Sequence, residues 1–127
     1  MVLFLQWKKQ MHNQYIIQFQ KKQKKEKQRF ESKRQSIISL FPHISNELKQ
    51  INAKRILVYG SILRPKSFHH KSDLDILVYG LDIDKWFKAY KIVEQITSNI
   101  DIAIDVHLSQ EMDQVFLSSV EEYGLII

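Results

Sequence analysis

One short apolar run, at residues 73–79 (DLDILVY), carries two carboxylates on a single face. Successive side chains of a β-strand point to opposite faces, so Asp73 and Asp75 lie on one face while Leu74 and Ile76 lie on the other. Carboxylates on such a strand are costly to desolvate unless they are paired or bound to a cation. The run therefore requires a sheet that packs one face on a core and leaves the other open to solvent or to a ligand.

A second run of the same design follows at residues 100–108 (IDIAIDVHL). Its odd-numbered positions share one face and include Asp101, Asp105 and His107, while apolar side chains fill the other face. Asp101 lies at the strand entrance, where a capping or solvent-exposed role is favoured, so Asp105 is the predicted third carboxylate. We interpret His107 as packed or exposed, with orientation of a phosphate or an acceptor as the alternative.

Three carboxylates on two strands make a hard-oxygen site of the kind that Mg²⁺ prefers together with substrate phosphates. Two such ions, about 3.5–4 Å apart, can hold both the attacking and the leaving oxygen of an in-line phosphoryl displacement. The sequence thus predicts that Asp73, Asp75 and Asp105 are the metal-binding and catalytic residues, with two Mg²⁺ ions expected.

Upstream, residues 55–59 form a β-rich run that ends in Gly60 and Ser61, followed by a basic loop with Arg64 and two lysines. A glycine lets the backbone approach a phosphate closely, and free N–H groups with a hydroxyl can bind it. The cations of the loop would neutralise part of a triphosphate's charge. This arrangement predicts a phosphate-binding turn beside the carboxylates.

Periodicity places the remaining elements and gives the fold class. The predicted helices are residues 12–40, interrupted near Pro42 and continued to residue 51, then 82–98 and a last helix from Ser109; a terminal strand follows at 125–127. We predict an α/β (α+β) fold with a small mixed β-sheet, helices packed mainly on one face and an extra N-terminal basic helix. The predicted division is a basic helical arm, residues 1–29, and a domain, residues 30–127.

Charge is also distributed unevenly along the chain. Residues 1–55 have a net charge of +10 and residues 56–127 one of −5. The favoured interpretation of the arm is a helix that faces solvent or an acidic partner. Nucleic acid is the alternative partner, but no aromatic residue lies within the Lys/Gln run at 20–28 to stack on bases. The absence of cysteine excludes disulfides and thiolate metal sites, and a cytoplasmic location without membrane attachment is expected.

Two segments carry a family resemblance: residues 59–64 (YGSILR) and 72–78 (SDLDILV). Together they resemble the signature of the polymerase β-type nucleotidyltransferase superfamily, and within it the minimal nucleotidyltransferases (MNT) of prokaryotes. The segments 104–108 (IDVHL) and 120–125 (VEEYGL) match later parts of the same pattern. The resemblance covers residues 30–127 and omits the arm.

The resemblance implies roles for single residues. Asp73 and Asp75 would bind both metal ions, and Asp105 would bind the catalytic one and help to activate the acceptor hydroxyl. The residues to which it gives nucleotide binding are Gly60, Ser61, Arg64 and Ser72. Two departures affect the phosphate geometry: the loop 62–72 is one residue longer than the family usually has, and Pro65 replaces the small residue that commonly follows the arginine.

The resemblance also implies a function, because many such domains pair with a small helical HEPN ribonuclease toxin. They act as antitoxins that transfer AMP from ATP to a tyrosine of that toxin. The expected protein is therefore a Mg²⁺-dependent protein adenylyltransferase with ATP as donor and a HEPN-type toxin as partner. Two alternatives stay open: an antitoxin that neutralises by binding alone, and an aminoglycoside-type enzyme that modifies a small molecule. No residue selects the base of the nucleotide.

Overall fold

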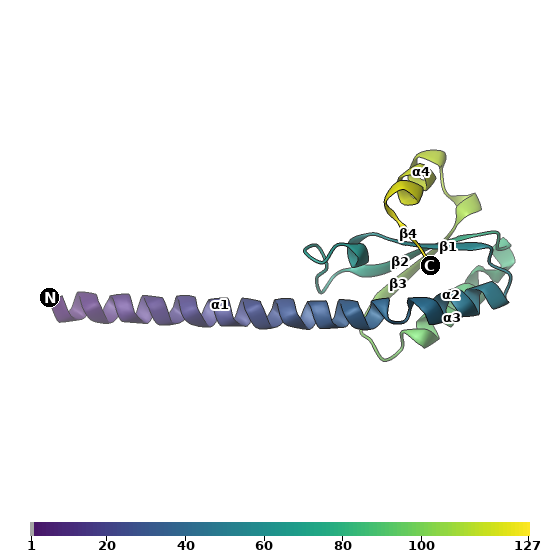
Figure 1. Ribbon diagram of the computed structural model, residues 1–127. Helices are drawn as coiled ribbons and strands as arrows, with labels where there is room; N and C mark the ends of the chain where they lie inside the picture. Colours follow the sequence, from purple (N-terminus) through teal and green to yellow (C-terminus); the bar gives the residue numbers. More distant parts are fainter. Residues whose placement is uncertain (1) are drawn as a thin grey trace.

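The computed structural model describes residues 2–127, which form a small α+β domain with one long projecting helix (Figure 1). The helices are α1 (Val2–Ile38), α2 (Phe41–Gln50), α3 (Trp86–Ile96) and α4 (Gln114–Tyr123), and the strands are β1 (Arg55–Tyr59), β2 (Asp73–Tyr79), β3 (Ala103–Leu108) and β4 (Leu125–Ile126). Single 3₁₀ turns, η1 (Ser61–Leu63), η2 (Ile83–Lys85) and η3 (Ser109–Glu111), connect them. The predicted fold class is confirmed.

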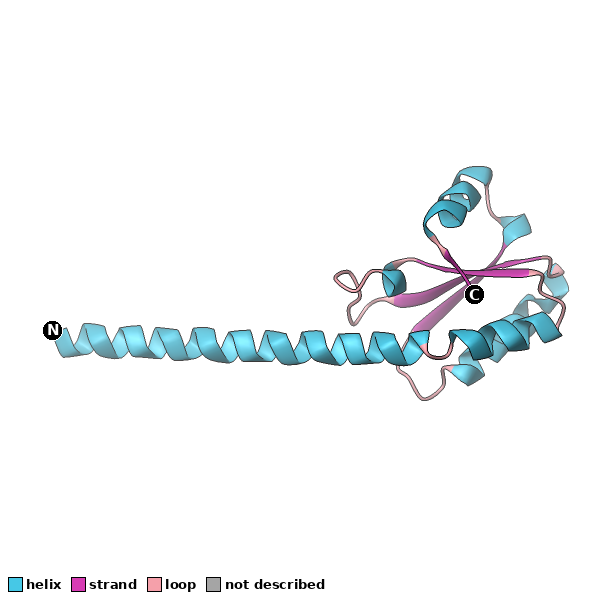
Figure 2. Cartoon of the chain, in the orientation of Figure 1, coloured by secondary structure: helices cyan, strands magenta, loops and turns pink. Residues whose placement is uncertain are grey.

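The sheet is mixed, with the strand order β3-β2-β1-β4 (Figure 2). Strand β1 runs antiparallel to both β2 and β4, whereas β2 and β3 are parallel. A parallel pair needs a long crossover, which η2 and α3 supply here. This order makes β2 and β3 neighbours, so the two strands that carry the predicted carboxylates lie side by side.

Helices cover both faces of the sheet unequally (Figure 1). The larger core lies between the sheet and the α1 end, α2 and α3, and it takes Leu74, Ile76 and Val78 from β2. On the opposite face, Leu77 of β2 packs with Leu57 and with Val120 of α4 in a smaller cluster. Helices therefore pack mainly on one face, as predicted, and α4 is the helix that covers the carboxylate-bearing face.

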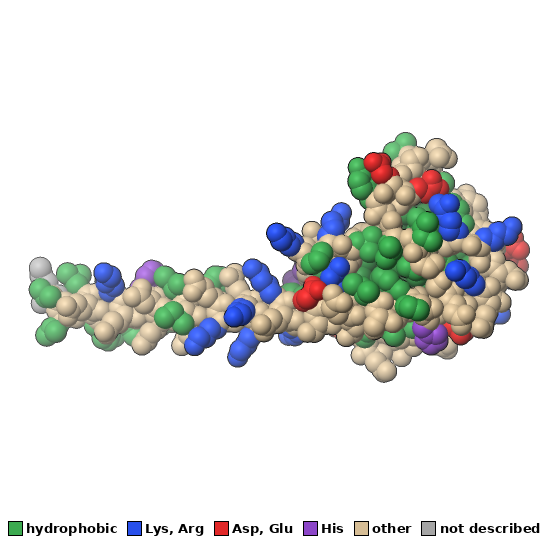
Figure 3. Space-filling view, in the orientation of Figure 1, with side chains coloured by type: hydrophobic (Ala, Val, Ile, Leu, Met, Phe, Trp, Pro, Cys, Tyr) green, Lys and Arg blue, Asp and Glu red, His purple; other side chains and the backbone are tan. Residues whose placement is uncertain are grey.

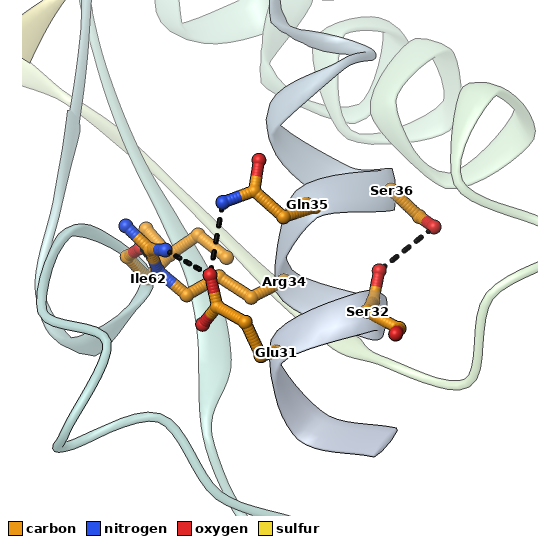
Figure 4. Close-up of polar contacts among 6 residues, drawn as sticks. All are labelled: Glu31, Ser32, Arg34, Gln35, Ser36 and Ile62. Carbon is orange, nitrogen blue, oxygen red and sulfur yellow. Dashed lines mark hydrogen bonds and ion pairs between the residues drawn. The ribbon is translucent and has the colours of Figure 1, made fainter. Parts of the chain in front are cut away.

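The last turns of α1 fasten this helix to the domain (Figure 4). Ile37 is fully buried, and the Arg34 guanidinium donates from Nε to the Ile62 carbonyl over 2.7 Å. The same guanidinium pairs with Glu31 over 3.0 Å from Nη1. Because Ile62 lies in η1, the long helix also supports the turn that follows Gly60.

The first part of α1 stands clear of the domain (Figure 3). We predicted that the helix would start at residue 12, but it starts at Val2, since residues 2–11 also lack glycine and proline. Between Val2 and Arg29 every side chain is exposed except that of Met11, which is half-buried. Among residues 2–127, no helix combines the length and the apolar composition needed to cross a bilayer.

Aromatic residues of α3 correct one prediction. The three- and four-residue spacing of Trp86, Phe87 and Tyr90 in the helix predicted at 82–98 indicates core positions, but the Phe87 side chain is 60% exposed and that of Trp86 38%. Trp86 stacks on Tyr90 and donates its indole N–H to the Val106 carbonyl over 2.6 Å. Trp86 thus ties α3 to β3 from the surface, which spacing alone could not indicate.

The N-cap of α4 is also a different residue from the one predicted. Ser109 begins η3, and Asp113 caps α4 by accepting the Phe116 N–H at Oδ1 over 2.8 Å. Replacing Asp113 with alanine leaves that N–H without its partner, so we expect the free energy of unfolding to fall by about 1 kcal/mol. Asp82, exposed before η2 with no side-chain cap bond, is the matched control and should change it by less than about 0.5 kcal/mol on replacement. Equal effects in urea titrations would contradict the assignment.

Candidate active site

Three ionisable side chains form a row across three strands. Tyr59 at the end of β1 is the register partner of Asp75 in β2, and Asp75 is the partner of Asp105 in β3. Neighbouring strands lie about 4.8 Å apart, so register partners on one face are close neighbours. Asp73 shares this face and is exposed at the start of β2. The structure therefore brings Asp75 and Asp105 together and places Asp73 at the open end.

Gly60 packs its backbone directly against the Asp75 carboxylate. Its φ of +86° and ψ of −157° belong to a region that is essentially restricted to glycine. A Cβ atom built on Gly60 would lie 2.6 Å from Asp75 Oδ2, closer than side-chain contacts allow. The carboxylate beside Gly60 thus leaves no room for a side chain there, and Gly60 links the turn that the sequence predicts to bind phosphate to the acidic row.

Negative charge is concentrated in this row. Burial, followed by the charges of Asp105 and Asp73, raises the pKa of Asp75 from its ordinary value of 3.8 to about 6, with His107 acting in the opposite direction. Burial and the same neighbouring carboxylates, Asp75 before Asp105, also raise the pKa of the Tyr59 hydroxyl. Both shifts mean that the row favours a bound proton or a cation over a further anionic group.

His107 lies two residues after Asp105 and contacts it. Its Nε2 is 3.2 Å from Asp105 Oδ2, and its ring packs edge-on against Phe116 with 6.2 Å between the centroids. Phe116 also packs edge-on against Tyr59 at 5.5 Å. One aromatic ring of α4 therefore bridges β1 and β3 on the carboxylate-bearing face of the sheet.

Contacts at the far end of α4 fix its position. Glu121 accepts a hydrogen bond from the Tyr79 hydroxyl over 2.7 Å and pairs with Arg55 over 3.3 Å. The Arg55 guanidinium also lies over the Tyr79 ring, 4.5 Å from its centroid. Helix α4 is therefore held to β1 and β2 by polar contacts at this end and by Phe116 nearer its start.

A groove of about 380 Å³ lies between the β1–η1 turn and α4. Its lining residues are Tyr59, Gly60, Leu63, Arg64, Ser119, Val120, Tyr123 and Gly124. Because Tyr59 and Gly60 both touch the carboxylate row or form part of it, the groove adjoins the acidic site. Two residues predicted to bind nucleotide, Gly60 and Arg64, thus line one hollow that could accept a phosphate chain.

The two predicted serines lie in different surroundings. Ser61 is half-buried at the first position of η1, directly after Gly60. Ser72 is buried; its Oγ accepts the His69 N–H over 2.9 Å and its own N–H donates to the His69 carbonyl over 3.0 Å. These bonds close the basic loop just before Asp73, and a direct role for either serine in nucleotide binding stays a prediction.

The carboxylates of the row are also candidate metal ligands. Within residues 2–127, no three histidine or acidic side chains lie close enough together to surround a metal ion. Mg²⁺ seldom requires such a cage, because one or two carboxylates with substrate phosphates and waters suffice. The half-buried Asp75, its partner Asp105 and the elevated Asp75 pKa fit a cation that arrives with a nucleotide.

The structure separates Asp101 from Asp105, and it adds two neighbours of the acidic row that the sequence analysis did not name as such. Asp101 lies before β3, which begins at Ala103, and is exposed, whereas Asp105 is the residue opposite Asp75. The sequence analysis did not identify Tyr59 as part of the row, although its position directly before Gly60 could have indicated it. Phe116 had no signal of its own, because only the packing of α4 brings it over the sheet.

Comparisons with known proteins bear on the fold. No protein-family model matches the chain, and a search of curated proteins finds no match. Among solved structures, the fold resembles a chain from a crystal structure of a toxin-antitoxin with AMP-PNP, with a TM-score of 0.51 and 22% sequence identity. The match covers 65% of this chain and 68% of the other. At this identity the likeness establishes a shared fold, and the chain has the fold of a protein found in a toxin-antitoxin structure with a nucleotide analogue.

Proposed function

We propose that this chain is a Mg²⁺-dependent nucleotidyltransferase and the antitoxin of a toxin-antitoxin pair. It transfers AMP from ATP to a tyrosine of a HEPN-type ribonuclease toxin. The observation that carries the proposal is the contact between Gly60 and Asp75, with Asp105 as the register partner of Asp75. This geometry joins a phosphate-binding turn to a pair of carboxylates, which is what transfer of a nucleotidyl group requires.

Each residue has a chemical task in this reaction. Gly60 and Arg64, which line the groove beside α4, would hold the triphosphate together with Ser61 of the adjoining turn. Asp73, Asp75 and Asp105 would hold the Mg²⁺ ions, which would neutralise phosphate charge when bound with the nucleotide. The acceptor hydroxyl oxygen bonds to the α-phosphorus as the bond to pyrophosphate breaks, and Asp105 is placed to take the hydroxyl proton. His107, 3.2 Å from Asp105, orients that carboxylate.

The toxin partner is supported by one observation: a solved structure with this fold is that of a toxin-antitoxin with AMP-PNP, which is an analogue of ATP. The HEPN identity of the toxin and the tyrosine acceptor rest on the resemblance of residues 59–64 and 72–78 to minimal nucleotidyltransferases.

A second candidate, an antitoxin that acts by binding alone, is favoured by several features of the site. Asp73 is exposed at the start of β2, and the acidic side chains within residues 2–127 do not close around a metal position. Pro65 and the longer loop 62–72 also change the turn that is predicted to bind phosphate, which again favours binding alone over catalysis. Under this candidate the fold serves as a docking surface and the carboxylates are dispensable.

Incubation with α-labelled ATP and Mg²⁺, with and without a co-encoded helical protein, distinguishes the two. We expect label on the partner with the wild-type chain and none with an Asp73→Asn/Asp75→Asn double variant. A parallel growth assay measures neutralisation of the toxin. Failure to label, together with neutralisation by the double variant, would overturn the enzymatic proposal, and label on a small hydroxyl compound without any partner would redirect it to small-molecule modification.

A further inference from the structure

The projecting part of α1 bears an exposed aromatic stripe. Phe4, Trp7, Met11, Tyr15 and Phe19 follow one another at intervals of three or four residues, the spacing that places side chains on one helix face. The four aromatic side chains are 56%, 56%, 64% and 61% exposed, in that order. The domain does not reach this part of the helix (Figure 1). A face of this size and composition on an unsupported helix is typical of an interaction surface.

Its composition indicates a protein partner. Tyr, Trp, Phe and Met are enriched at the centres of protein interfaces. An aromatic side chain can bury about 150–250 Å², so two copies of the stripe packed together would remove roughly 1,000 Å² from water. That area is about the minimum for a specific protein interface, and α1 can reach it without help from the domain.

The stripe is nearly symmetric about its middle, which indicates the partner's identity. Trp7 and Tyr15 lie four residues before and after Met11, and Phe4 and Phe19 lie seven residues before and eight after it. A two-fold interface requires a patch that complements itself when turned round. In an antiparallel pair centred on Met11, Trp7 of each copy faces Tyr15 of the other.

Charge selects the antiparallel arrangement over the parallel one. Residues 20–29 carry six Lys/Arg and one Glu, and a parallel pair would place these two runs side by side. In the antiparallel pair the runs extend from opposite ends and begin about 30 Å apart, at 1.5 Å per residue. This separation is several Debye lengths at physiological salt, so the repulsion is screened. Lys8 then faces Gln14 and Lys9 faces Asn13, which adds no like-charge pair.

We propose that residues 4–19 of α1 form an antiparallel, two-fold helix pair with a second copy of this chain. The pair is centred on Met11 and leaves two basic runs and two nucleotidyltransferase-like domains at opposite ends. The arm is thus a dimerisation element. This inference does not depend on the activity of the domain.

Sedimentation velocity of the full-length chain tests the surface. We expect a dimer for the wild type at micromolar concentration, and at least a tenfold rise in the dimer dissociation constant for the Trp7→Lys/Tyr15→Lys variant. Ile17→Lys is the matched control, because Ile17 is an exposed apolar residue of the same arm that lies two positions from Tyr15 and so on the opposite side of the helix. A monomeric wild type, or a double variant that dimerises as well as the Ile17 control, would overturn the proposal.

Disulfide trapping tests the direction, since the chain contains no cysteine. Met11→Cys should cross-link with itself under mild oxidation. Trp7→Cys alone and Tyr15→Cys alone should remain largely monomeric on a non-reducing gel, while an equimolar mixture of the two should give the cross-linked species. Efficient cross-linking of Trp7→Cys with itself would indicate a parallel pair and contradict the proposal. Val115→Cys, at an exposed position on α4, gives the background level of cross-linking. A mixture of Trp7→Cys and Tyr15→Cys that cross-links no better than this background would also contradict the proposal.

Discussion

Replacing Asp75 with asparagine is expected to lower nucleotidyl transfer by roughly 1,000-fold while making the metal-free protein more stable at pH 8. The loss follows because Asp75 is the half-buried carboxylate between Gly60 and Asp105 and would bind the metal ions of the reaction. The gain follows because asparagine removes a charge that burial and two neighbouring carboxylates disfavour. Transfer is measured with α-labelled ATP and stability by urea unfolding in EDTA.

The pH dependence of the gain has a definite sign. Folded Asp75 has a pKa of about 6, above its ordinary value of 3.8, so the folded state binds the proton more tightly than the unfolded state. Its contribution to stability is therefore complete below pH 3.8 and is lost as the pH rises through 6. Because the group is only half-buried, we expect asparagine to stabilise by about 1–2 kcal/mol at pH 8 and by almost nothing at pH 4.

Two controls isolate the cause of that effect. Asp101→Asn changes the same residue type at an exposed position before β3 and should alter neither transfer nor unfolding. Addition of Mg²⁺ and a non-hydrolysable ATP analogue should stabilise the wild type by about 1.4 kcal/mol for each tenfold excess over the dissociation constant, and the Asp75 variant much less. If asparagine changed the free energy of unfolding by the same amount at pH 4 and at pH 8, relative to the wild type, charge crowding at Asp75 would be unimportant.

The sequence predicted the acidic pair well because the parity of a strand is a local property. Alternation places Asp73 and Asp75 on one face whatever surrounds the strand, and the same holds for Asp105. It could not fix where β3 begins, because hydrogen bonds from the N–H of Ile100 to Thr97 and of Ile102 to Ile100 form a turn that local propensity does not reveal. Strand boundaries depend on such contacts with neighbouring elements.

Which residues of α4 lie over the candidate site depends on tertiary packing and could not be predicted from the sequence. Helical spacing identified α4 but not which of its residues meets the sheet, so the packing of Phe116 against Tyr59 and His107 was missed. Helical spacing also gave the wrong environment for Phe87, because this exposed residue fits the same helical repeat as the buried residues of α3. In both cases the amphipathic pattern fixes a helix but not its rotation against its neighbours.

Replacing Gly60 with alanine is expected to lower both stability and transfer, in contrast to the change at Asp75. The backbone region with φ near +86° and ψ near −157° is unfavourable for alanine, and its Cβ would lie 2.6 Å from Asp75 Oδ2. The carboxylate is the flexible partner and must move away from its position beside the turn. We expect the free energy of unfolding to fall by roughly 2–4 kcal/mol and transfer, measured well below the unfolding midpoint, to fall about 100-fold.

Gly80 provides the matched control because it also has a positive φ and no room for a Cβ atom but lies away from the acidic row. Its φ is +78°, and a Cβ there would lie 2.6 Å from Cγ of Lys54, so Gly80→Ala should also destabilise the protein. It should leave transfer nearly unchanged, since neither residue touches Asp75 or the groove beside α4. If both glycine variants lost transfer in proportion to stability, Gly60 would be only a turn residue. If only Gly60→Ala lost transfer, the absence of a side chain at Gly60 would be what allows the Asp75 carboxylate to keep its position.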